Sequence, residues 1–282
     1  MYRTLIDPSM LVRHLADPDW AIVDCRFDIA DTGRGERQYR YDHIPGAAYA
    51  HLDNHLSDRK TGTNGRHPLP EPSALRRDLS ALGIGPATQV VAYDADNSTY
   101  AARLWWLLRW LGHAAVAVLD GGYARWCREG HPVRSGIETS EPKNFQGEPL
   151  RATWLTAEEV ASGLGDPTRL LVDSRSNDRY HGINETIDKT GGHIPGAANY
   201  FFMGNMTREK IFKSPEELSA QWSALLNGRD PNELVLYCGS GVTACNNLLA
   251  LEHAGLPGAK LYPGSWSEWS ADPARPTAKD KD

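Results

Sequence analysis

The sequence contains an internal repeat that covers nearly its whole length. Landmark residues of the first half recur in the same order in the second half. The pairs, with their separations in residues, are Asp24 and Asp173 (149), Pro45 and Pro195 (150), Asp94 and Cys238 (144), and Trp126 and Trp269 (143). Ordered anchors with nearly one offset indicate a tandem duplication of a single folding unit. The length of 282 residues also favours two domains over one core.

Each half alternates short apolar runs with segments of helical periodicity. The expected strands are residues 21–26, 89–93, 115–119, 170–175 and 234–237. The expected helices are residues 7–15, 74–82, 98–112 and 242–253, together with helices that start at capping boxes at 156–159 and 214–217. The segment after the first strand, up to residue 72, is expected to be irregular. This alternation predicts an α/β fold, in which each repeat is a parallel sheet with helices on both faces.

The domain boundaries are expected where periodicity is lost. Residues 132–149 are rich in Gly, Pro, Glu and Ser, so we place a linker at 136–150. The N-terminal domain then occupies residues 1–135 and the C-terminal domain residues 151–272. The charged, proline-containing tail at 273–282 is expected to be frayed.

Charge and cysteine content narrow the classes of partner. The formal net charge is −6 and there is no basic run, so we expect neither nucleic acid nor a membrane as a partner. Any anionic ligand must therefore be held by local groups. The cysteines, Cys25, Cys127, Cys238 and Cys245, are scattered, which argues against a zinc site and a disulfide framework. With no apolar signal-peptide core near the N-terminus, we expect a cytoplasmic protein with reduced thiols.

The second half places Cys238 in a position suited to a reactive thiol. An apolar run leads into Cys238, and Gly239 and Gly241 then permit a tight loop whose N–H groups can point at the sulfur. The helix that follows puts its positive end near this residue, where a thiolate is stabilised. The alternative is a buried structural cysteine at the end of a strand.

The corresponding position of the first half holds Asp94, followed by Ala95 and Asp96. A carboxylate cannot act as a sulfur nucleophile and would repel an anion. We therefore expect the second half to be catalytic, with the first half as scaffold and one wall of the cleft.

Several motifs resemble those of two-domain rhodanese-type sulfurtransferases. They are the loop Cys-Gly-Ser-Gly-Val-Thr-Ala at 238–244, His-Ile-Pro-Gly-Ala at 43–47 and 193–197, Val-Asp-Ser-Arg at 172–175, and Gly-Ser-Trp-Ser-Glu-Trp at 264–269. The loop is most similar to that of the mercaptopyruvate-using branch of the family. The resemblance implies that the Cys238 thiolate takes the outer sulfur of a small anionic donor, forms a persulfide and passes the sulfur to an acceptor. It implies no metal or organic cofactor.

The resemblance also assigns roles in binding the donor. The loop N–H groups of Gly239, Gly241, Val242 and Thr243 would stabilise the anionic persulfide. Arg179 matches the family position whose guanidinium holds the carboxylate or sulfonate of the donor; the alternative is a surface arginine paired with an acid. The second arginine that usually precedes Gly-His-Ile-Pro-Gly is missing here.

In the absence of that arginine, Lys189 is the nearby cation in the sequence, and we take it as the candidate for the second anion anchor. Arg175 follows a strand directly, and we expect it to be structural and paired with a buried acid. His43 and His193 recur in both halves, including the half without the cysteine, so we expect structural roles for them as well.

The loop serine adds a proton-transfer hypothesis. In the mercaptopyruvate branch it is assigned to a triad with a histidine and an aspartate, and Asp53, His67 and Ser240 match those positions. Such a set would move protons to the pyruvate enolate left when sulfur departs. The alternative is that Asp53 caps a turn and that His67 simply lies in a proline-rich loop.

The same loop guides the choice of donor and the rival functions. Neutral Gly239 and Ser240 favour mercaptopyruvate over thiosulfate, since thiosulfate-preferring members usually place basic residues there. The acceptor is expected to be cyanide, a thiol or a thioredoxin-like protein. A phosphatase of similar fold needs an arginine at the position of Ala244, so the sequence disfavours a phosphatase function. A persulfide carrier and a binding module without efficient turnover remain alternatives.

Overall fold

The computed structural model describes residues 1–279 and divides the chain into two compact units. Unit 1 consists of Met1–Asp58, Pro70–Leu150 and Arg208–Phe212. Unit 2 consists of Arg59–Leu69, Arg151–Thr207 and the residues from Lys213 onward. Each unit therefore takes one short segment from the opposite half of the sequence, an exchange that the pattern of the repeat does not predict.

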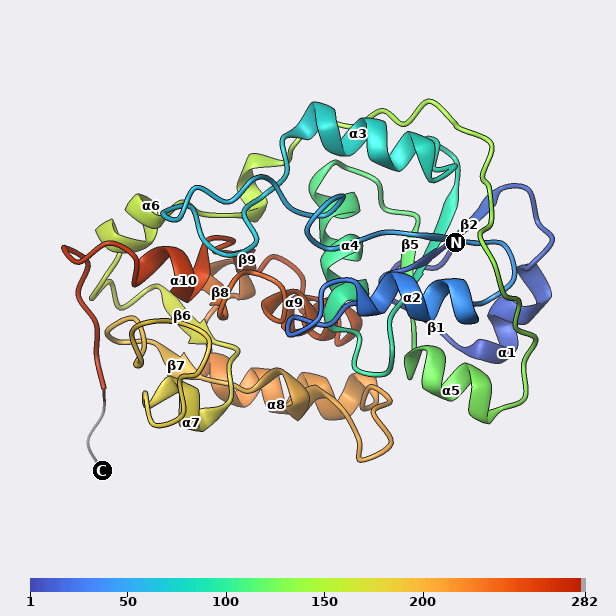
Figure 1. Ribbon diagram of the computed structural model, residues 1–282. Helices are drawn as coiled ribbons and strands as arrows, with labels where there is room; N and C mark the ends of the chain where they lie inside the picture. The colour runs from blue at the N-terminus through green and yellow to red at the C-terminus, as the bar shows by residue number, and fades with distance from the viewer. Residues whose placement is uncertain (280–282) are drawn as a thin grey trace. The chain divides into compact units, whose positions relative to one another are not determined.

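Unit 1 is built on a parallel sheet with the strand order β1-β5-β4-β2-β3. Figure 1 labels three of these strands, β1, β2 and β5. Its strands are β1 Leu5–Ile6, β2 Trp20–Asp24, β3 Ala47–Tyr49, β4 Gln89–Tyr93 and β5 Val116–Leu119. All residues of β4 and β5 are buried, as expected for central strands covered on both faces. The expected strands of the first half are thus confirmed.

The helices of unit 1 alternate with its strands along the chain. They are α1 Pro8–Leu11, η1 Val12–His14, α2 Arg34–Tyr41, α3 Pro72–Ala81, α4 Thr99–Trp110 and α5 Gly122–Arg128. Helix α2 lies in the stretch predicted as irregular, so that prediction was wrong. Gly35 and Tyr39 are its buried residues, while exposed Glu36 and Arg40 form an i,i+4 ion pair. With so few apolar positions, α2 offers no hydrophobic period to detect.

Unit 2 repeats the arrangement with the strand order β7-β6-β8-β9, again all parallel. Its strands are β6 Leu170–Asp173, β7 Ala198–Asn199, β8 Leu234–Tyr237 and β9 Lys260–Leu261. A parallel bridge from Trp154 to Leu261 occupies the place that β1 holds beside β5 in unit 1. The α/β fold and its tandem duplication are therefore confirmed.

The helices of unit 2 begin where the sequence places their caps. They are η2 Arg151–Thr153, α6 Ala157–Ser162, α7 Asn177–Tyr180, η3 Phe202–Asn205, α8 Pro215–Leu226, η4 Pro231–Glu233, α9 Ala244–His253 and α10 Ser265–Trp269. Both predicted capping boxes are present, with Thr156 and Glu159 at α6 and Ser214 and Glu217 at α8. Helix α9 starts two residues later than predicted.

An equivalent buried ion pair lies at the end of β6 in unit 2 and at the end of β2 in unit 1. Arg175 contacts Asp173 at 2.6 Å in unit 2, and Arg26 contacts Asp24 at 2.6 Å in unit 1. Burial opposes a charge on Arg175, but the attraction of Asp173 outweighs it and raises the pKa of the guanidinium. The expected structural role of Arg175 is confirmed.

The paired histidines are structural as well. His43 Nδ1 lies 2.7 Å from the Tyr39 carbonyl oxygen, and His193 Nδ1 lies 2.9 Å from that of Tyr180. Each ring stacks on the same tyrosine whose carbonyl it contacts, and both histidines are buried. The role expected from their recurrence is therefore confirmed.

The segment predicted as a linker, residues 136–150, packs onto unit 1. Phe145 is 3% exposed, and the backbone N–H of Leu150 donates to the Trp110 carbonyl oxygen at 2.8 Å. The described part of the tail is also tied down, because Ala278 pairs with His193 through backbone hydrogen bonds. Buried apolar contact and backbone pairing thus order segments that look flexible by composition.

Candidate active site

The nucleophile predicted from the sequence, Cys238, follows β8 and is 1% exposed. Its backbone N–H donates to Ser265 Oγ at 3.1 Å, and its carbonyl oxygen accepts from the Trp266 N–H at 3.0 Å. The Gly241 N–H donates to the Cys238 sulfur at 3.1 Å. The loop and the start of α10 therefore hold this sulfur in place, and one amide already points at it.

Gly241 is required for this loop geometry. Its φ is +73°, and a Cβ placed on it would lie 2.3 Å from the Pro263 carbonyl oxygen. An L side chain is excluded there both by backbone conformation and by space. The loop then passes through Val242 and Thr243 into α9; the contribution of their N–H groups to persulfide binding stays a prediction.

Ser240 and His67 meet in unit 2. His67 Nδ1 lies 2.7 Å from Ser240 Oγ, and the two residues are 3% and 6% exposed. His67 reaches this place because the 59–69 segment belongs to unit 2. Asp53 belongs to unit 1, where its backbone N–H donates to His51 Nδ1 at 3.1 Å. Its membership of a triad stays a prediction.

Arg179 is held by acidic side chains. Its Nε and Nη2 donate to Glu185 at 2.9–3.0 Å, and Nη2 also donates to Asp188 at 3.3 Å. Glu185 in turn accepts from Arg175 at 3.1 Å. The guanidinium of Arg179 is thus oriented before any donor binds, and its side chain is 19% exposed.

The sequence does not single out Arg66, which the structure places beside Asp188 and Gly239. Its Nη1 donates to Asp188, and its backbone N–H donates to Ser267 Oγ at 2.9 Å. A Cβ placed on Gly239 would lie 2.8 Å from Arg66 Nη2. Lys189, the cation suggested by the sequence, is exposed and its role stays a prediction. The adjacency of Arg66 to His67 was the available signal, but 122 residues separate Arg66 from its ion-pair partner.

The two carboxylates of this network differ in ionisation. Burial would raise the pKa of Glu185, but amide donors from Asp188 and Ile187 and the Arg179 guanidinium hold that pKa below its usual value. Burial raises the pKa of Asp188 despite the attraction of Arg66, and the nearby Glu185 adds to the rise. Glu185 is therefore the firmer anion of the pair.

Comparison with known proteins identifies the family. The rhodanese-like domain family matches residues 7–129 and again residues 156–272. The chain belongs to the rhodanese family. A probable 3-mercaptopyruvate sulfurtransferase of Pseudomonas aeruginosa is 45% identical over 276 residues, which cover 97% of each chain. The thiosulfate sulfurtransferase of Cricetulus griseus is 36% identical over 279 residues, 95% of this chain and 92% of that protein.

A solved rhodanese-family structure agrees with the fold. The 3-mercaptopyruvate sulfurtransferase of Leishmania major superposes with a TM-score of 0.85 at 31% identity, covering 95% of this chain and 74% of that one. Together with the relatives named above, this match makes the present chain a sulfurtransferase of the rhodanese family.

The first rhodanese repeat carries a different loop. The Asp94 carboxylate accepts the N–H groups of Ser98, Tyr100 and Ala101 at 3.0, 2.8 and 3.2 Å. Burial raises the pKa of Asp94 to about 6, although these amide donors oppose the rise. The side chain that replaces the cysteine is thus consumed in capping the start of α4, which fits its expected non-catalytic role.

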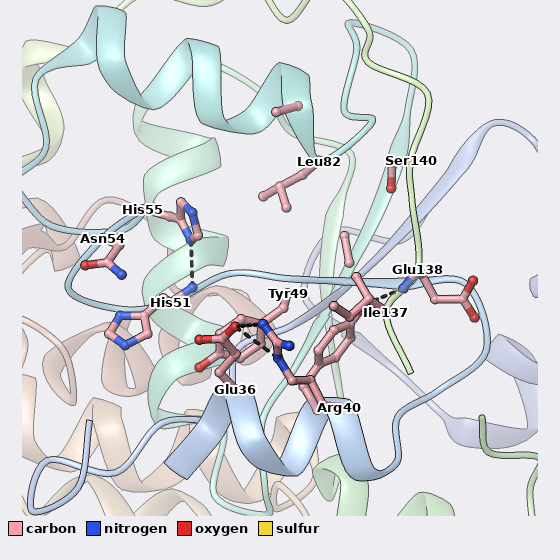
Figure 2. Close-up of a pocket in the computed structure, with 13 residues that line it drawn as sticks. Glu36, Arg40, Tyr49, His51, Asn54, His55, Leu82, Ile137, Glu138 and Ser140 are labelled. Carbon is pink, nitrogen blue, oxygen red and sulfur yellow. Dashed lines mark hydrogen bonds and ion pairs between the residues drawn. The ribbon is translucent and has the colours of Figure 1, made fainter. Parts of the chain in front are cut away.

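Unit 1 contains a pocket of about 420 Å³, and none of the candidate site residues of unit 2 lines it (Figure 2). Figure 2 shows Glu36 bound to Arg40 and the His51 N–H donating to His55 Nδ1, which are recorded at 2.7 and 2.9 Å. Burial lowers the pKa of His55. These polar groups bind one another, and no cysteine is among the residues that line the pocket.

Proposed function

We propose that this sulfurtransferase uses 3-mercaptopyruvate as its preferred donor and works through a persulfide on Cys238. The observation that carries the proposal is the buried contact between Ser240 and His67. Ser240 lies two residues after the nucleophile in the same loop. A serine–histidine pair can move protons, and mercaptopyruvate is the donor whose carbon skeleton must be protonated when sulfur leaves. The name of the relative from Pseudomonas aeruginosa agrees with this choice.

The first half-reaction balances without a redox partner. The Cys238 thiolate attacks the donor sulfur, the S–S bond forms, and the carbon–sulfur bond breaks with its electron pair passing into a pyruvate enolate. The proton of the donor thiol is transferred to the enolate carbon, giving pyruvate and an anionic persulfide. The Gly241 N–H, 3.1 Å from the Cys238 sulfur, is placed to stabilise negative charge on that sulfur.

In this scheme Ser240 and His67 carry the proton, and Asp53 orients His67. The contact of 2.7 Å between His67 Nδ1 and Ser240 Oγ supports the first two assignments. The role of Asp53 rests on the family resemblance alone.

Thiosulfate is the second candidate donor. Arg179 offers a guanidinium suited to a sulfonate, and the relative from Cricetulus griseus is a thiosulfate sulfurtransferase. Its leaving group is sulfite, which needs no proton on carbon. If thiosulfate were the preferred donor, the Ser240–His67 pair would therefore have no proton to transfer during catalysis.

The second half-reaction needs a nucleophile of small size or a protein thiol. We propose cyanide, a low-molecular-weight thiol or a thioredoxin-like protein as the acceptor, and the cytoplasm as the compartment. The cysteines are free thiols, as a reducing compartment requires. Within residues 1–279, no helix has the length and apolar character needed to cross a membrane.

The test is sulfur transfer to cyanide with 3-mercaptopyruvate and thiosulfate compared by kcat/KM on one preparation. A kcat/KM at least about tenfold higher for mercaptopyruvate supports the proposal, since a tenfold ratio corresponds to about 1.4 kcal/mol of transition-state preference. A preference for thiosulfate overturns the donor assignment and leaves the persulfide chemistry standing. Persulfide formation without turnover would instead identify a carrier.

A further inference from the structure

We propose that residues 182–191 of unit 2, called the 182–191 loop below, form a docking surface for a protein that brings a thiol to the Cys238 persulfide. The inference rests on the proposed function, because it concerns which acceptor removes the sulfur. It adds a surface that favours a protein dithiol over small thiols as the acceptor.

The 182–191 loop closes on itself and is fastened to the active site. A Cβ placed on Gly191 would lie 3.0 Å from the Gly182 carbonyl oxygen, so the two ends of the loop are in contact. The Trp266 indole N–H donates to the Thr190 carbonyl oxygen at 2.8 Å. The backbone N–H of the same tryptophan donates to the Cys238 carbonyl oxygen at 3.0 Å. One residue therefore ties this compact loop to the nucleophile, and loops of this kind are frequently functional.

The acidic side chains of the 182–191 loop are buried. The side chains of Glu185 and Asp188 are 3% and 7% exposed. Glu185 accepts hydrogen bonds from Arg179 at 2.9–3.0 Å and from Arg175 at 3.1 Å. Asp188 accepts from Arg179 at 3.3 Å. Carboxylates are rarely buried unless they are paired, so these arginines determine which side chains of the loop face inward.

The isoleucines of the loop are exposed instead. Ile183 is 68% exposed and Ile187 is 44% exposed, although the Ile187 backbone N–H donates to buried Glu185 at 2.9 Å. Within the loop, all of which the structure describes, the other exposed residues are Asn184, Thr186 and Lys189. The outer face of the loop is thus apolar, with one positive charge and no carboxylate. This arrangement reverses the usual one, in which acids face water and isoleucines are buried.

The exposed apolar surface of unit 2 is confined to one edge of its sheet. In the described part of this unit, the exposed large apolar side chains are those of Ile183 and Ile187, which follow β6, and Phe201, which follows β7. Strands β6, β7 and β8 are parallel, so their C-terminal ends lie at a common edge, where Cys238 follows β8. Apolar surface that gathers beside a reactive group in this way marks an interaction site.

The position of this surface identifies its partner. Sulfur leaves the protein from Cys238, which is 1% exposed, so an acceptor has to approach the edge of the sheet where this residue lies. A small thiol needs no docking surface to do so, whereas a protein thiol does. An apolar face with one lysine complements a protein whose thiol is surrounded by apolar and acidic groups. A small dithiol protein of the thioredoxin type, whose thiol ionises near neutral pH, meets this description.

The transfer to such a partner balances without a further reagent. The first thiol of the partner bonds to the outer sulfur of the Cys238 persulfide and gives that sulfur its proton. The sulfur–sulfur bond of the Cys238 persulfide breaks, and its electron pair returns to Cys238 as a thiolate. The second thiol of the partner then displaces hydrogen sulfide and leaves a disulfide. The dithiol is oxidised, and the transferred sulfur is reduced to sulfide.

Two other roles for the loop give different results. If the isoleucines bind a second copy of this chain, their loss changes the oligomeric state and leaves sulfur transfer to a protein thiol unchanged. If the loop covers the donor, their loss changes persulfide formation. A docking surface for the acceptor affects only the transfer to a protein, because the two half-reactions of a ping-pong mechanism can be measured separately.

The experiment starts from protein already loaded with sulfur from 3-mercaptopyruvate or thiosulfate and freed of donor. It is mixed with reduced thioredoxin or with dithiothreitol, and sulfide release gives a second-order rate constant for each. The double variant Ile183→Ser, Ile187→Ser should lower the constant for thioredoxin by about tenfold or more, which corresponds to about 1.4 kcal/mol of lost contact. The constant for dithiothreitol and the rate of persulfide loading should stay at the wild-type values. Valine at both positions should restore most of the thioredoxin rate.

The double variant Ile29→Ser, Ile137→Ser is the matched control, because these isoleucines of unit 1 are 45% and 62% exposed. It should leave every constant unchanged. An unchanged thioredoxin constant in the loop variant overturns the proposal, as does an equal fall with dithiothreitol or in the control. Slower persulfide loading, or a wild-type dimer that the loop variant dissociates in sedimentation, also overturns it. A wild type that forms no persulfide with either donor shows that the proposed function itself has failed.

Discussion

Side chains of the same type have different surroundings in this protein, although the sequence gives no sign of the difference. Cys238 and Cys245 are both buried in unit 2, yet Cys238 accepts the Gly241 N–H whereas the Cys245 thiol donates to the Gly241 carbonyl oxygen at 3.3 Å. Charge stabilisation at sulfur therefore falls on Cys238. The two cysteines therefore differ in expected reactivity, because different backbone groups contact their sulfur atoms.

The first prediction concerns the nucleophile. Cys238→Ser should abolish turnover with both donors, because a serine hydroxyl at neutral pH cannot form a persulfide. The measurement is steady-state sulfur transfer, with mass spectrometry of the protein to detect a gain of one sulfur atom. Cys127→Ser, which changes an exposed thiol of unit 1, is the control and should keep full activity. Turnover by the Cys238 variant would disprove the persulfide mechanism.

The second prediction concerns the proton-transfer pair. His67→Gln should reduce kcat for 3-mercaptopyruvate by about 100-fold or more, a usual loss when a general acid–base group is removed. Thiosulfate turnover should change little, because sulfite departs without protonation of carbon. The two donors are compared in the same preparation. Equal losses with both donors would show that His67 supports the loop and takes no part in proton transfer.

At the level of elements, the two repeats use one geometry for two purposes. Strand β8 delivers Cys238 to a loop ahead of α9, and β4 delivers Asp94 to a loop ahead of α4. In the first repeat three backbone N–H groups bind the carboxylate of Asp94. An anion that belongs to the chain thus fills the place where the second repeat would hold a persulfide.

The third prediction follows from the raised pKa of Asp94. Burial raises this pKa from 3.8 to about 6, so the folded state binds the proton more tightly than the unfolded state. Its stabilising effect is complete below pH 3.8 and is lost as pH rises through 6. Relative to the wild type, Asp94→Asn should gain up to about 3 kcal/mol of unfolding free energy between pH 4 and 7.

Urea denaturation of both proteins at pH 4, 5, 6 and 7 measures this difference. Sulfur transfer by Asp94→Asn at pH 7 should match the wild type, because Asp94 lies in the repeat without the nucleophile. A difference in stability that stays constant with pH would contradict the raised pKa. A large loss of activity in the folded variant would contradict the scaffold role of the first repeat.

At the level of the whole molecule, the units depend on segments exchanged between the two halves of the sequence. Residues 59–69 supply Arg66 and His67 to unit 2. Residues 208–212 belong to unit 1, where Lys210 pairs with Asp96 and the Phe212 N–H donates to Asp120 at 2.9 Å. Such exchange gives the half without a nucleophile a part in building the active site.

The fourth prediction tests that dependence. Replacement of residues 60–68 by a Gly/Ser linker of equal length should lower kcat/KM for 3-mercaptopyruvate by about 100-fold or more, because the His67 contact with Ser240 is lost. Hydrogen exchange should show native protection in β2, β4 and β5 of unit 1. Wild-type efficiency would show that the 59–69 segment adds nothing to the reaction, while loss of protection would reveal a role in folding.

Much of the fold could be predicted because its determinants are local or repeated. Apolar runs predict buried parallel strands, and Ser214 and Thr156 mark helix starts through their own capping boxes. Helix α2 escaped prediction because its hydrophobic contact is confined to Gly35 and Tyr39. The packed segment 136–150 escaped because one buried phenylalanine and a few backbone hydrogen bonds leave little trace in composition.

The sequence by itself determined the duplication, the α/β class, the identity of Cys238 as the candidate nucleophile and the unequal loops of the two repeats, since these depend on residue type and spacing along the chain. Only the tertiary structure decided that Arg66 and His67 belong to the unit that holds Cys238. Their partners, Asp188 and Ser240, are 122 and 173 residues away. Contacts over such separations form by packing and charge pairing as the chain folds, and residue type and spacing alone do not reveal them.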